Sequence, residues 1–496
     1  MKCALENPLF LSEMVELYRT VWETWLVPAN WGHSKLVATW KGAAKGRRDD
    51  PAAYRALQIG SSLCKVMVVI IIERIKTWYE CQLLDCQHGF RSGRSTVDGI
   101  YNLKRMHHVT ASMKKPVYLL FIDLTAAFDH VDRSWLFSSI EQRIKNEAER
   151  ALFRLIQCLY SRTTSSLAQT PSDIFEVKCG VRQGGPESPL LYNLLMDYVM
   201  RIFIKECSES GVEFLRLKYR IPASASKTSI ETVGHHIMDW LGYADDLVLM
   251  LENKTSLRKS IEILNETFQR FGLEINVKKT KTMIINYAND PNDYPDTLIR
   301  LNNKDIDNVK EFIYLGCKMK FNESMTGNCE VHMRVDLADS KFYELGRNLM
   351  NKKILLHTRT KILNASVRSR LTYACQSWNI TQSQFNKMSS TYYAMLRKMI
   401  KGGYRRIGNT WRYALTNKDL LRISNTEDVS EFVKRQQRNY VSHIIRQDNE
   451  STSKRLMFND NHRRTRGPHS TLLQSVIEFA HVDDETFMEN AMNRVY

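Results

Sequence analysis

A nearly continuous apolar run, Pro116 to Leu124 (PVYLLFIDL), is the feature that most constrains how this chain folds. A short unbroken apolar run is typical of a strand buried inside a sheet, because a surface strand alternates polar and apolar residues. A helix-like pattern through Trp135 and Ile140 follows the run. The one charged residue of the apolar run is Asp123, so the sequence predicts a carboxylate at the end of a buried strand.

Three further patterns predict the elements around this strand. Met238 to Leu251 (MDWLGYADDLVLML) has two aspartates between two short apolar runs, which predicts a tight hairpin whose turn carries Ala244 and Asp245. The spacing of apolar residues predicts helices over Pro186 to Cys207 and from Leu257 to Phe271. Strand, helix, hairpin and helix in this order predict an α+β unit, in which helices cover one face of an antiparallel sheet.

The chain is expected to divide into several units, because 496 residues exceed the usual size of one compact domain. A polar, basic stretch from Lys41 to Pro51 predicts a loop after a helical N-terminal segment. Basic helical patterns dominate from Asp339 to Met399. We therefore expect an N-terminal helical extension (1–50), an α+β unit (51–320), a helical unit (321–405) and a basic C-terminal region (406–496).

The charge balance favours a polyanionic partner. Lys and Arg exceed Asp and Glu by 71 − 54 = 17, which indicates nucleic acid, although a solvated basic surface or an anionic membrane surface fits the charge alone. The longest apolar run, Val66 to Ile72, is too short to cross a bilayer, and the first ten residues lack the apolar core of a signal peptide. We expect a soluble intracellular protein without membrane association.

Asp123, Asp245 and Asp246 are the candidate catalytic residues. If the sheet sets the strand beside the hairpin, the three carboxylates meet, and such hard oxygen ligands favour Mg²⁺ or Mn²⁺. Two such ions about 4 Å apart can activate a 3′-hydroxyl and neutralise a leaving pyrophosphate, which is nucleotidyl transfer. The alternative is that aspartate is simply common in turns, but charges beside Trp240 and Leu247 are costly in a purely structural role.

Six motifs in one order resemble the reverse transcriptases of non-LTR retrotransposons of the LINE type, such as RTE or jockey elements. They are QHGFRSGRST (Gln87–Thr96), FIDLTAAFDHV (Phe121–Val131), GVRQGGPESPLL (Gly180–Leu191), YADDLVL (Tyr243–Leu249), GLEINVKKTKT (Gly272–Thr282) and YLG (Tyr314–Gly316). The resemblance implies a right-hand polymerase, with fingers and palm in residues 51–320 and a thumb in 321–405. It also implies RNA-directed DNA polymerase activity on an RNA template, a DNA primer or target and deoxynucleoside triphosphates, in the nucleus, the cytoplasm or both.

The same resemblance implies roles for individual residues. Asp123, Asp245 and Asp246, with Leu124 beside them, bind the metal. Phe128 lies where similar polymerases place an aromatic ring that excludes a 2′-hydroxyl; the alternative is an ordinary core phenylalanine. The implied nucleotide-binding residues are Arg55, Lys65, Arg91, Phe128, Gln183 and Lys279, for whose basic members surface solvation is the alternative. The implied template and primer contacts are Gln183, Gly184, Tyr314, Leu315 and Gly316.

Two features depart from the family pattern. Gly185 and Glu187 stand where the family usually has aspartate and leucine, and we expect the extra carboxylate to weaken template binding. Relatives also commonly carry an N-terminal endonuclease, which we expect this chain to lack. A catalytically inactive nucleic-acid-binding remnant, or a domesticated protein similar to reverse transcriptases, is therefore the alternative to an active enzyme. A protein like an intron maturase is disfavoured, because the tail shows no maturase pattern.

Overall fold

A computed structural model describes residues 6–42, 46–168, 173–222, 230–287, 293–322, 328–400, 404–407, 410–459, 472–480 and 482–493. Up to residue 209 the elements are α2 (Pro8–Thr24), β1 (His33–Trp40), β2 (Tyr54–Gly60), α3 (Ser62–Tyr79), α4 (Thr96–Ser112), β3 (Val117–Ile122), α5 (Arg133–Glu141), α6 (Glu147–Tyr160), β4 (Thr164–Leu167), β5 (Ile174–Glu176) and α7 (Ser188–Glu209). They continue with β6 (Leu215–Pro222), β7 (Ile230–Met238), β8 (Trp240–Tyr243), β9 (Asp246–Leu251), α8 (Lys254–Arg270), β10 (Lys281–Ile285), β11 (Thr297–Leu301), β12 (Lys304–Asp307), β13 (Glu311–Tyr314) and β14 (Cys317–Lys320). The last are α9 (Asn328–Glu344), α10 (Gly346–Leu349), α11 (Leu356–Leu363), α12 (Ser369–Leu371), α13 (Gln382–Ile400), β15 (Tyr404–Ile407), β16 (Thr410–Tyr413), α14 (Asn417–Ser424), α15 (Val429–Ile445), α16 (Thr452–Met457), α17 (Leu472–Ala480) and α18 (Asp484–Met492).

The central sheet has the strand order β10-β3-β9-β8, and every neighbouring pair is antiparallel. The predicted buried strand is β3, which lies between β10 and β9. The predicted hairpin is β8–β9, in which Tyr243 pairs with Asp246. The α+β class, the antiparallel sheet and the hairpin turn at Ala244 and Asp245 are therefore confirmed.

The prediction that helices cover only one face of this sheet is wrong. Leu120 and Ile122 of β3 pack into a core shared with α7 and α8. Leu119 and Phe121, the alternate residues of the same strand, pack into a second core with α4 and with the β6–β7 hairpin. Successive side chains of a strand point to opposite faces, so the unbroken apolar run that predicted a buried strand also requires cover on both sides.

The first fifty residues are not wholly helical, which corrects the predicted N-terminal extension. Strand β1 follows α2, and it pairs antiparallel with β2 and parallel with β4. Because β1 is largely half-exposed and carries polar residues, it has no apolar run that would mark it in the sequence. One of its partners lies more than a hundred residues away, so local pattern does not predict the pairing.

The two helices predicted near the candidate site are present. Helix α7 begins at Ser188 with a proline in its first turn, where the missing N–H of proline leaves no hydrogen bond unmade. Helix α8 begins after Asn253, whose side chain accepts a hydrogen bond from the Ser256 amide at 2.8 Å. It ends before Gly272, which has a φ of +75°.

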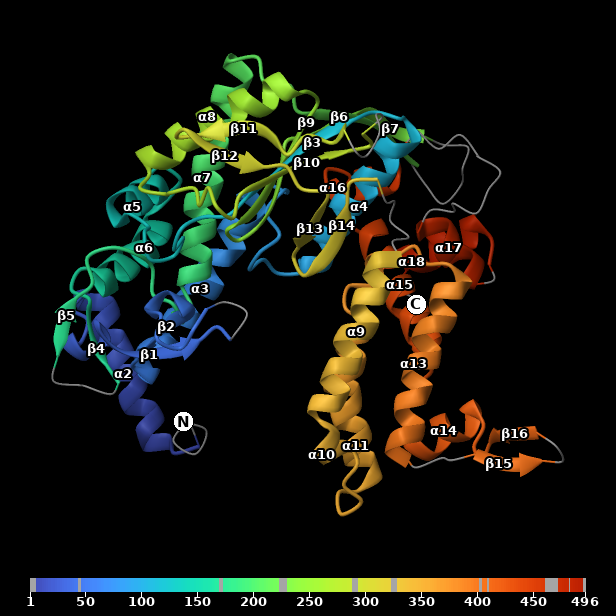
Figure 1. The fold of residues 1–496 in the computed structure, drawn as a ribbon. Coiled ribbons are helices and arrows are strands. Elements are labelled where there is room, and N and C mark those ends of the chain that lie inside the picture. The colour runs from blue at the N-terminus through green and yellow to red at the C-terminus, as the bar shows by residue number, and fades with distance from the viewer. Residues whose placement is uncertain are drawn as a thin grey trace.

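Helices dominate after residue 328, as predicted, but the last of them return to the first half of the chain. Figure 1 shows α9, α10, α11 and α13 grouped together. Helices α15, α17 and α18 form a second group, and α16 lies beside α4. Helix α4 is buried along most of its length, since its partners come from both halves. We call the contacts of α4 with residues 440–456 the C-terminal clasp.

Three hydrogen bonds form the C-terminal clasp. The Tyr440 hydroxyl donates to Asp98 at 3.0 Å, and the Ser453 hydroxyl donates to Asn102 at 2.9 Å. The Arg105 guanidinium donates to the Leu456 carbonyl at 3.0 Å. Polar groups buried on α4 are therefore satisfied by segments more than three hundred residues away.

Within the described residues, no helix combines the length and apolar content needed to cross a bilayer.

Candidate active site

Strand pairing brings Asp123 and Asp245 together. Ile122 pairs with Leu247 across β3 and β9, so Asp123, the next residue after Ile122, lies beside the β8–β9 turn. Burial raises the pKa of Asp245, and the charge of Asp123 raises it further, whereas Lys279 and Arg55 lower it. The two carboxylates are therefore close enough to repel each other, and two basic side chains offset that repulsion.

Lys279 lies against the first of these carboxylates. Its ammonium is 3.2 Å from the Asp123 carboxylate, although the lysine side chain itself is 66% exposed. The backbone of Asp123 is also fixed, because its N–H donates to the Thr280 hydroxyl at 3.3 Å and its carbonyl accepts from the Asn276 amide at 2.8 Å. The segment 276–280 thus holds the end of β3 in place.

The turn that carries Asp245 is held by Gln87, whose role the sequence analysis missed. Ala244 has a φ of +60°, in the left-handed region that costs a non-glycine residue energy. The Gln87 side chain, 1% exposed, donates to the Ala244 carbonyl at 3.3 Å and accepts from the Ala244 N–H at 3.0 Å. Gly89 packs so closely that a Cβ there would lie 2.4 Å from the Ala244 nitrogen. In the sequence, Gln87 and Gly89 of the QHGF motif are the residues that could have indicated this contact, since a side-chain amide can bind a turn backbone and a glycine allows it to approach closely.

Burial raises the pKa of the Tyr192 phenol, and the charges of Asp245 and Asp246 both raise it further, so the two carboxylates share this neighbour. Burial raises the pKa of the Tyr314 phenol, and the charge of Asp246 raises it further. The described residues include no group of three or more His, Cys, Asp or Glu side chains placed to hold one metal ion. The structure brings Asp123 and Asp245 together as a pair, and the convergence of all three carboxylates on one metal ion stays a prediction.

The donor chemistry of this pair nevertheless fits a hard divalent cation. Two facing carboxylates favour a positive charge between them, and the Lys279 ammonium already supplies one at Asp123. Oxygen ligands of this kind suit Mg²⁺ or Mn²⁺. Leu124, the remaining predicted metal residue, has a buried side chain, so only its backbone carbonyl is available as a ligand.

A cleft of about 970 Å³ opens beside the carboxylate pair. It brings together the predicted residues Arg55, Lys65, Leu124, Phe128, Gln183 and Asp245. Lys41 and Arg182 add two more positive charges to its lining. The cleft thus has acidic groups at one end and several cations along its walls, an arrangement that suits a phosphate-bearing ligand with a bound metal.

Phe128 presents its ring to the cleft from a rigid support. The ring stacks on Tyr192, with 4.7 Å between ring centroids and 12° between ring planes. Tyr192 is fully buried in α7, so the ring beneath Phe128 has no room to move. Phe90, which is 50% exposed, contacts the Phe128 edge with ring centroids 6.3 Å apart.

Gln183 and Gly184 form part of a loop that is tied to β2. The Gln183 amide donates to both carboxylate oxygens of Asp129, at 2.8 and 2.7 Å, and the Gln183 carbonyl accepts from the Gln58 N–H at 2.7 Å. A Cβ on Gly184, which has a φ of +107°, would lie 3.1 Å from the Gln58 carbonyl oxygen. Both the backbone conformation and the close approach therefore favour glycine at this position.

The structure places Arg91 away from the cleft. Its guanidinium donates to the carbonyls of Leu84, Gln87 and Glu80, at 2.7, 3.1 and 2.8 Å. Burial lowers the pKa of this guanidinium. Arg91 therefore orders the loop before α4, and its contact with a nucleotide stays a prediction.

Tyr314, Leu315 and Gly316 lie at the turn between β13 and β14, apart from the cleft lining. The Leu315 carbonyl accepts a hydrogen bond from the Tyr373 hydroxyl at 2.9 Å, and the Gly316 carbonyl accepts one from Arg334 at 2.5 Å. Tyr314 is buried, with 3% of its surface exposed. The turn is thus fixed by residues of α9 and of the segment that follows α12.

Comparison with known proteins gives a consistent set of matches. The profile of the family described as "Reverse transcriptase (RNA-dependent DNA polymerase)" matches residues 44–319. The Pol polyprotein of the type-1 retrotransposable element R2 from Nasonia vitripennis is 27% identical over 237 residues, which are 48% of this chain and 21% of the polyprotein. The R2 polyprotein from Popillia japonica is 22% identical, over 48% of this chain and 31% of that protein. The matched part therefore spans a fifth to a third of these relatives.

Among solved structures, a telomerase from Candida tropicalis aligns with a TM-score of 0.39 and 13% identity, over 60% of this chain and 55% of that one.

Proposed function

Because the chain belongs to the reverse transcriptase family, we propose that it is an RNA-directed DNA polymerase of a non-LTR retrotransposon that extends a 3′-hydroxyl primer on an RNA template. The carboxylate pair of Asp123 and Asp245 beside a basic cleft is the observation that carries this proposal. The resemblance of the relatives, which are Pol proteins of R2 elements, supports it.

Asp123, Asp245 and the neighbouring Asp246 would hold the divalent metal, with Mg²⁺ or Mn²⁺ as the ion of choice. When bound, the metal supplies charge stabilisation to the attacking 3′-oxygen and to the leaving pyrophosphate. Asp246 would join the ligand set, because the register of β3 and β9, in which Ile122 pairs with Leu247, sets it beside Asp123. Lys279, held at Asp123, is positioned to leave that carboxylate for the phosphates when a cation takes its place.

The basic lining of the cleft binds the triphosphate. Arg55 and Lys65 face the cleft from β2 and α3, and guanidinium and ammonium groups there offset the charge of the phosphates. The Phe128 ring, fixed on Tyr192, closes the side of the cleft where a ribose 2′-hydroxyl would enter. The substrates are therefore deoxynucleoside triphosphates.

The rest of the chain serves the template and primer. In this proposal residues 51–320 form fingers and palm, 321–405 the thumb, and 406–496 a basic region that adds the C-terminal clasp. Gln183 and Gly184 contact the template, and the turn Tyr314–Gly316 lies at the primer side.

A protein that copies RNA into chromosomal DNA acts in the nucleus, the cytoplasm or both. The intact carboxylate pair and cleft support an active enzyme over an inactive remnant.

Primer extension on a defined RNA template tests the proposal. The purified chain with Mg²⁺ and deoxynucleotides is compared with an Asp245→Asn/Asp246→Asn variant and with Asp305→Asn, which removes a half-exposed carboxylate far from the cleft. Extension by the parent and by Asp305→Asn, but not by the double variant, is the expected result. A parent that binds the template and primer but extends nothing with either Mg²⁺ or Mn²⁺ would establish the binding-only alternative.

A further inference from the structure

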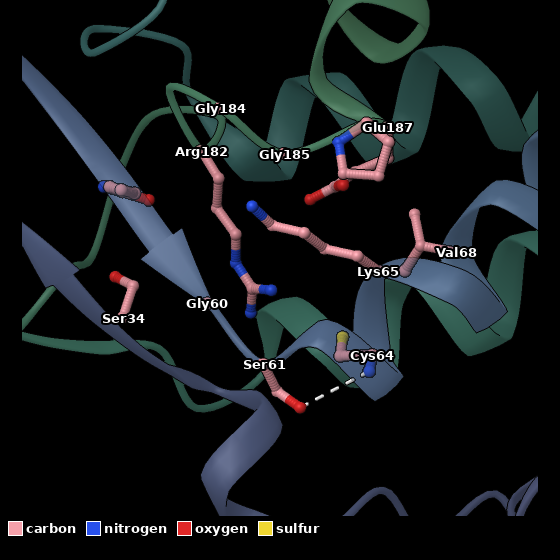
Figure 2. A pocket seen from close by; sticks show the side chains of 12 residues that line it. Ser34, Gly60, Ser61, Cys64, Lys65, Val68, Arg182, Gly184, Gly185 and Glu187 are labelled. Carbon is pink, nitrogen blue, oxygen red and sulfur yellow. Dashed lines mark hydrogen bonds between the residues drawn. The ribbon is translucent and has the colours of Figure 1, made fainter. Parts of the chain in front are cut away.

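A second, much smaller pocket lies behind the loop of Gly184, Gly185 and Pro186. Its volume is about 20 Å³, enough for roughly one water molecule. Figure 2 shows the side chains of Lys65, Arg182 and Glu187 pointing into it, from α3, from the loop and from the start of α7. Lys65 and Arg182 also line the large cleft. The two cavities therefore share part of their lining, and the small pocket lies directly behind the proposed nucleotide site.

The Glu187 carboxylate lines this pocket and not the large cleft, whereas the sequence analysis expected it to weaken template binding. Glu187 is 1% exposed, and the Tyr160 hydroxyl donates to its Oε1 at 3.0 Å. A Cβ on Gly185 would lie 2.6 to 2.9 Å from the three carboxyl atoms of Glu187. The carboxylate thus occupies the space that a side chain at position 185 would take, so the two unusual residues of this motif depend on each other.

Two basic side chains, Lys65 and Arg182, line the same pocket as the buried Glu187. Arg182 is fixed, because its guanidinium donates to the Leu159 carbonyl at 2.6 Å and lies over the Tyr160 ring. Burial raises the pKa of the neighbouring Cys64 to about 11, a shift to which Arg182, Glu187 and Lys65 all contribute charge effects. All three side chains border one small pocket, which Cys64 also lines. Without the carboxylate, Arg182 and Lys65 would face each other as like charges.

We propose that Glu187 is a positioning residue of the nucleotide site, whose carboxylate behind Gly185 holds the Lys65 ammonium beside Arg182 at the back of the cleft. The inference rests on the proposed function, since it assigns Lys65 to the triphosphate. Lys65 has a long flexible side chain that loses rotamer freedom when it binds a phosphate. A carboxylate that orders this side chain beforehand lowers that cost, because fewer conformations are lost on binding.

Steady-state extension with Glu187→Gln measures this role, because glutamine keeps the shape and the acceptor for Tyr160 but removes the charge. We expect the KM for deoxynucleotide to rise about tenfold with kcat changed less than about twofold, as for a lost ground-state contact. The removal of a negative charge near a triphosphate would by itself lower KM, so a lower KM would overturn the proposal. Glu262→Gln, an exposed carboxylate on α8, is the matched control.

A double-mutant cycle with Lys65→Met separates positioning from general damage. If Glu187 acts through Lys65, the KM effect of Glu187→Gln disappears in the Lys65→Met background. Equal effects in both backgrounds would contradict the proposal. Extension at saturating nucleotide remains measurable in each variant, so failure here is distinct from a parent without polymerase activity.

Exchange of the two motif positions gives an independent test. Gly185→Asp alone forces its side chain into the Glu187 carboxylate, and Glu187→Leu alone removes the charge between two cations. The double variant Gly185→Asp/Glu187→Leu returns one carboxylate to the same pocket, so we expect its KM to come back to within about threefold of the parent. A double variant as impaired as the sum of the single changes would show that the carboxylate is not what the pocket requires.

Discussion

Gln87 hydrogen-bonds both backbone polar groups of Ala244, although 157 residues separate them in the chain. One amide side chain from the loop before α4 thereby fixes the turn on which Asp245 stands. The position of Asp245 relative to Asp123 therefore depends on Gln87, although Gln87 contacts the backbone of Ala244 and neither carboxylate.

The first prediction concerns this support. Gln87→Ala leaves the buried N–H and carbonyl of Ala244 without partners, which costs about 1–3 kcal/mol for a buried polar group. We expect a lower free energy of unfolding and a fall in kcat of about tenfold, because the Asp245 carboxylate loses its fixed position. Urea unfolding and primer extension measure the two effects. Gln382→Ala, at an exposed position of α13, controls for the loss of an amide; equal behaviour of both variants would contradict the support role.

The second prediction concerns sugar selection. Phe128→Ala removes the ring that stacks on Tyr192, so a 2′-hydroxyl finds space. We expect the preference for deoxynucleotides over ribonucleotides to drop by about tenfold or more, since one lost steric contact of this kind is worth about 1–3 kcal/mol. Competition between the two nucleotide types in single-turnover extension measures the ratio. Trp135→Ala, which removes a 43% exposed aromatic ring outside the cleft, should leave the ratio unchanged, and an unchanged ratio in Phe128→Ala would rule out the gate.

The third prediction concerns pH. Burial and the charge of Asp123 raise the pKa of Asp245 above its ordinary value of 3.8. The folded protein therefore keeps this proton at pH values where the unfolded chain has lost it, so this group lowers stability as pH rises from about 4 through its folded pKa. Asp245→Asn has no titrating carboxyl at this position, so its unfolding free energy lacks this pH-dependent decrease. In metal-free buffer the unfolding free energy of Asp245→Asn minus that of the parent should grow with pH across this window and then become constant. A difference that does not depend on pH would contradict it.

The fourth prediction concerns the C-terminal clasp. Tyr440→Phe deletes the donor to the buried Asp98 carboxylate, and a hydrogen bond to a charged group contributes about 1.5–3 kcal/mol. We expect the unfolding free energy to fall by that amount and amide exchange in α4 to become faster. Tyr343→Phe is the control, because Tyr343 is 64% exposed and its hydroxyl accepts a hydrogen bond from Lys398. Identical stability of the two variants would mean that the clasp does not stabilise α4.

The sequence predicts the parts of the site that depend on local pattern. The apolar run that ends at Asp123, the hairpin that carries Asp245 and the helix that ends before Gly272 each have a periodicity and a terminating residue of their own. Their order along the chain also predicts an α+β fold. The family resemblance adds Arg55, Lys65, Phe128 and Gln183, all of which line one cleft.

The sequence does not predict the relations that arise only from tertiary packing. Arg91 looks like a phosphate ligand, yet its guanidinium donates its hydrogen bonds to the backbone carbonyls of Leu84, Gln87 and Glu80. Glu187 looks like an obstacle to the template, but the absence of a side chain at Gly185 lets it turn to the back of the loop.

The C-terminal clasp has a consequence for the order in which the protein is made. During synthesis the N-terminal part of a chain folds first, and here it already contains every residue of the cleft. Helix α4 still lacks its cover then, because Tyr440, Ser453 and Leu456 are translated more than three hundred residues after their partners on α4. A premature stop codon after residue 430 would remove no cleft residue, yet it would leave Asp98, Asn102 and Arg105 without these partners. The cleft and the cover of α4 are thus completed at different points of synthesis, so a chain that stops between them has every cleft residue but lacks these contacts of α4.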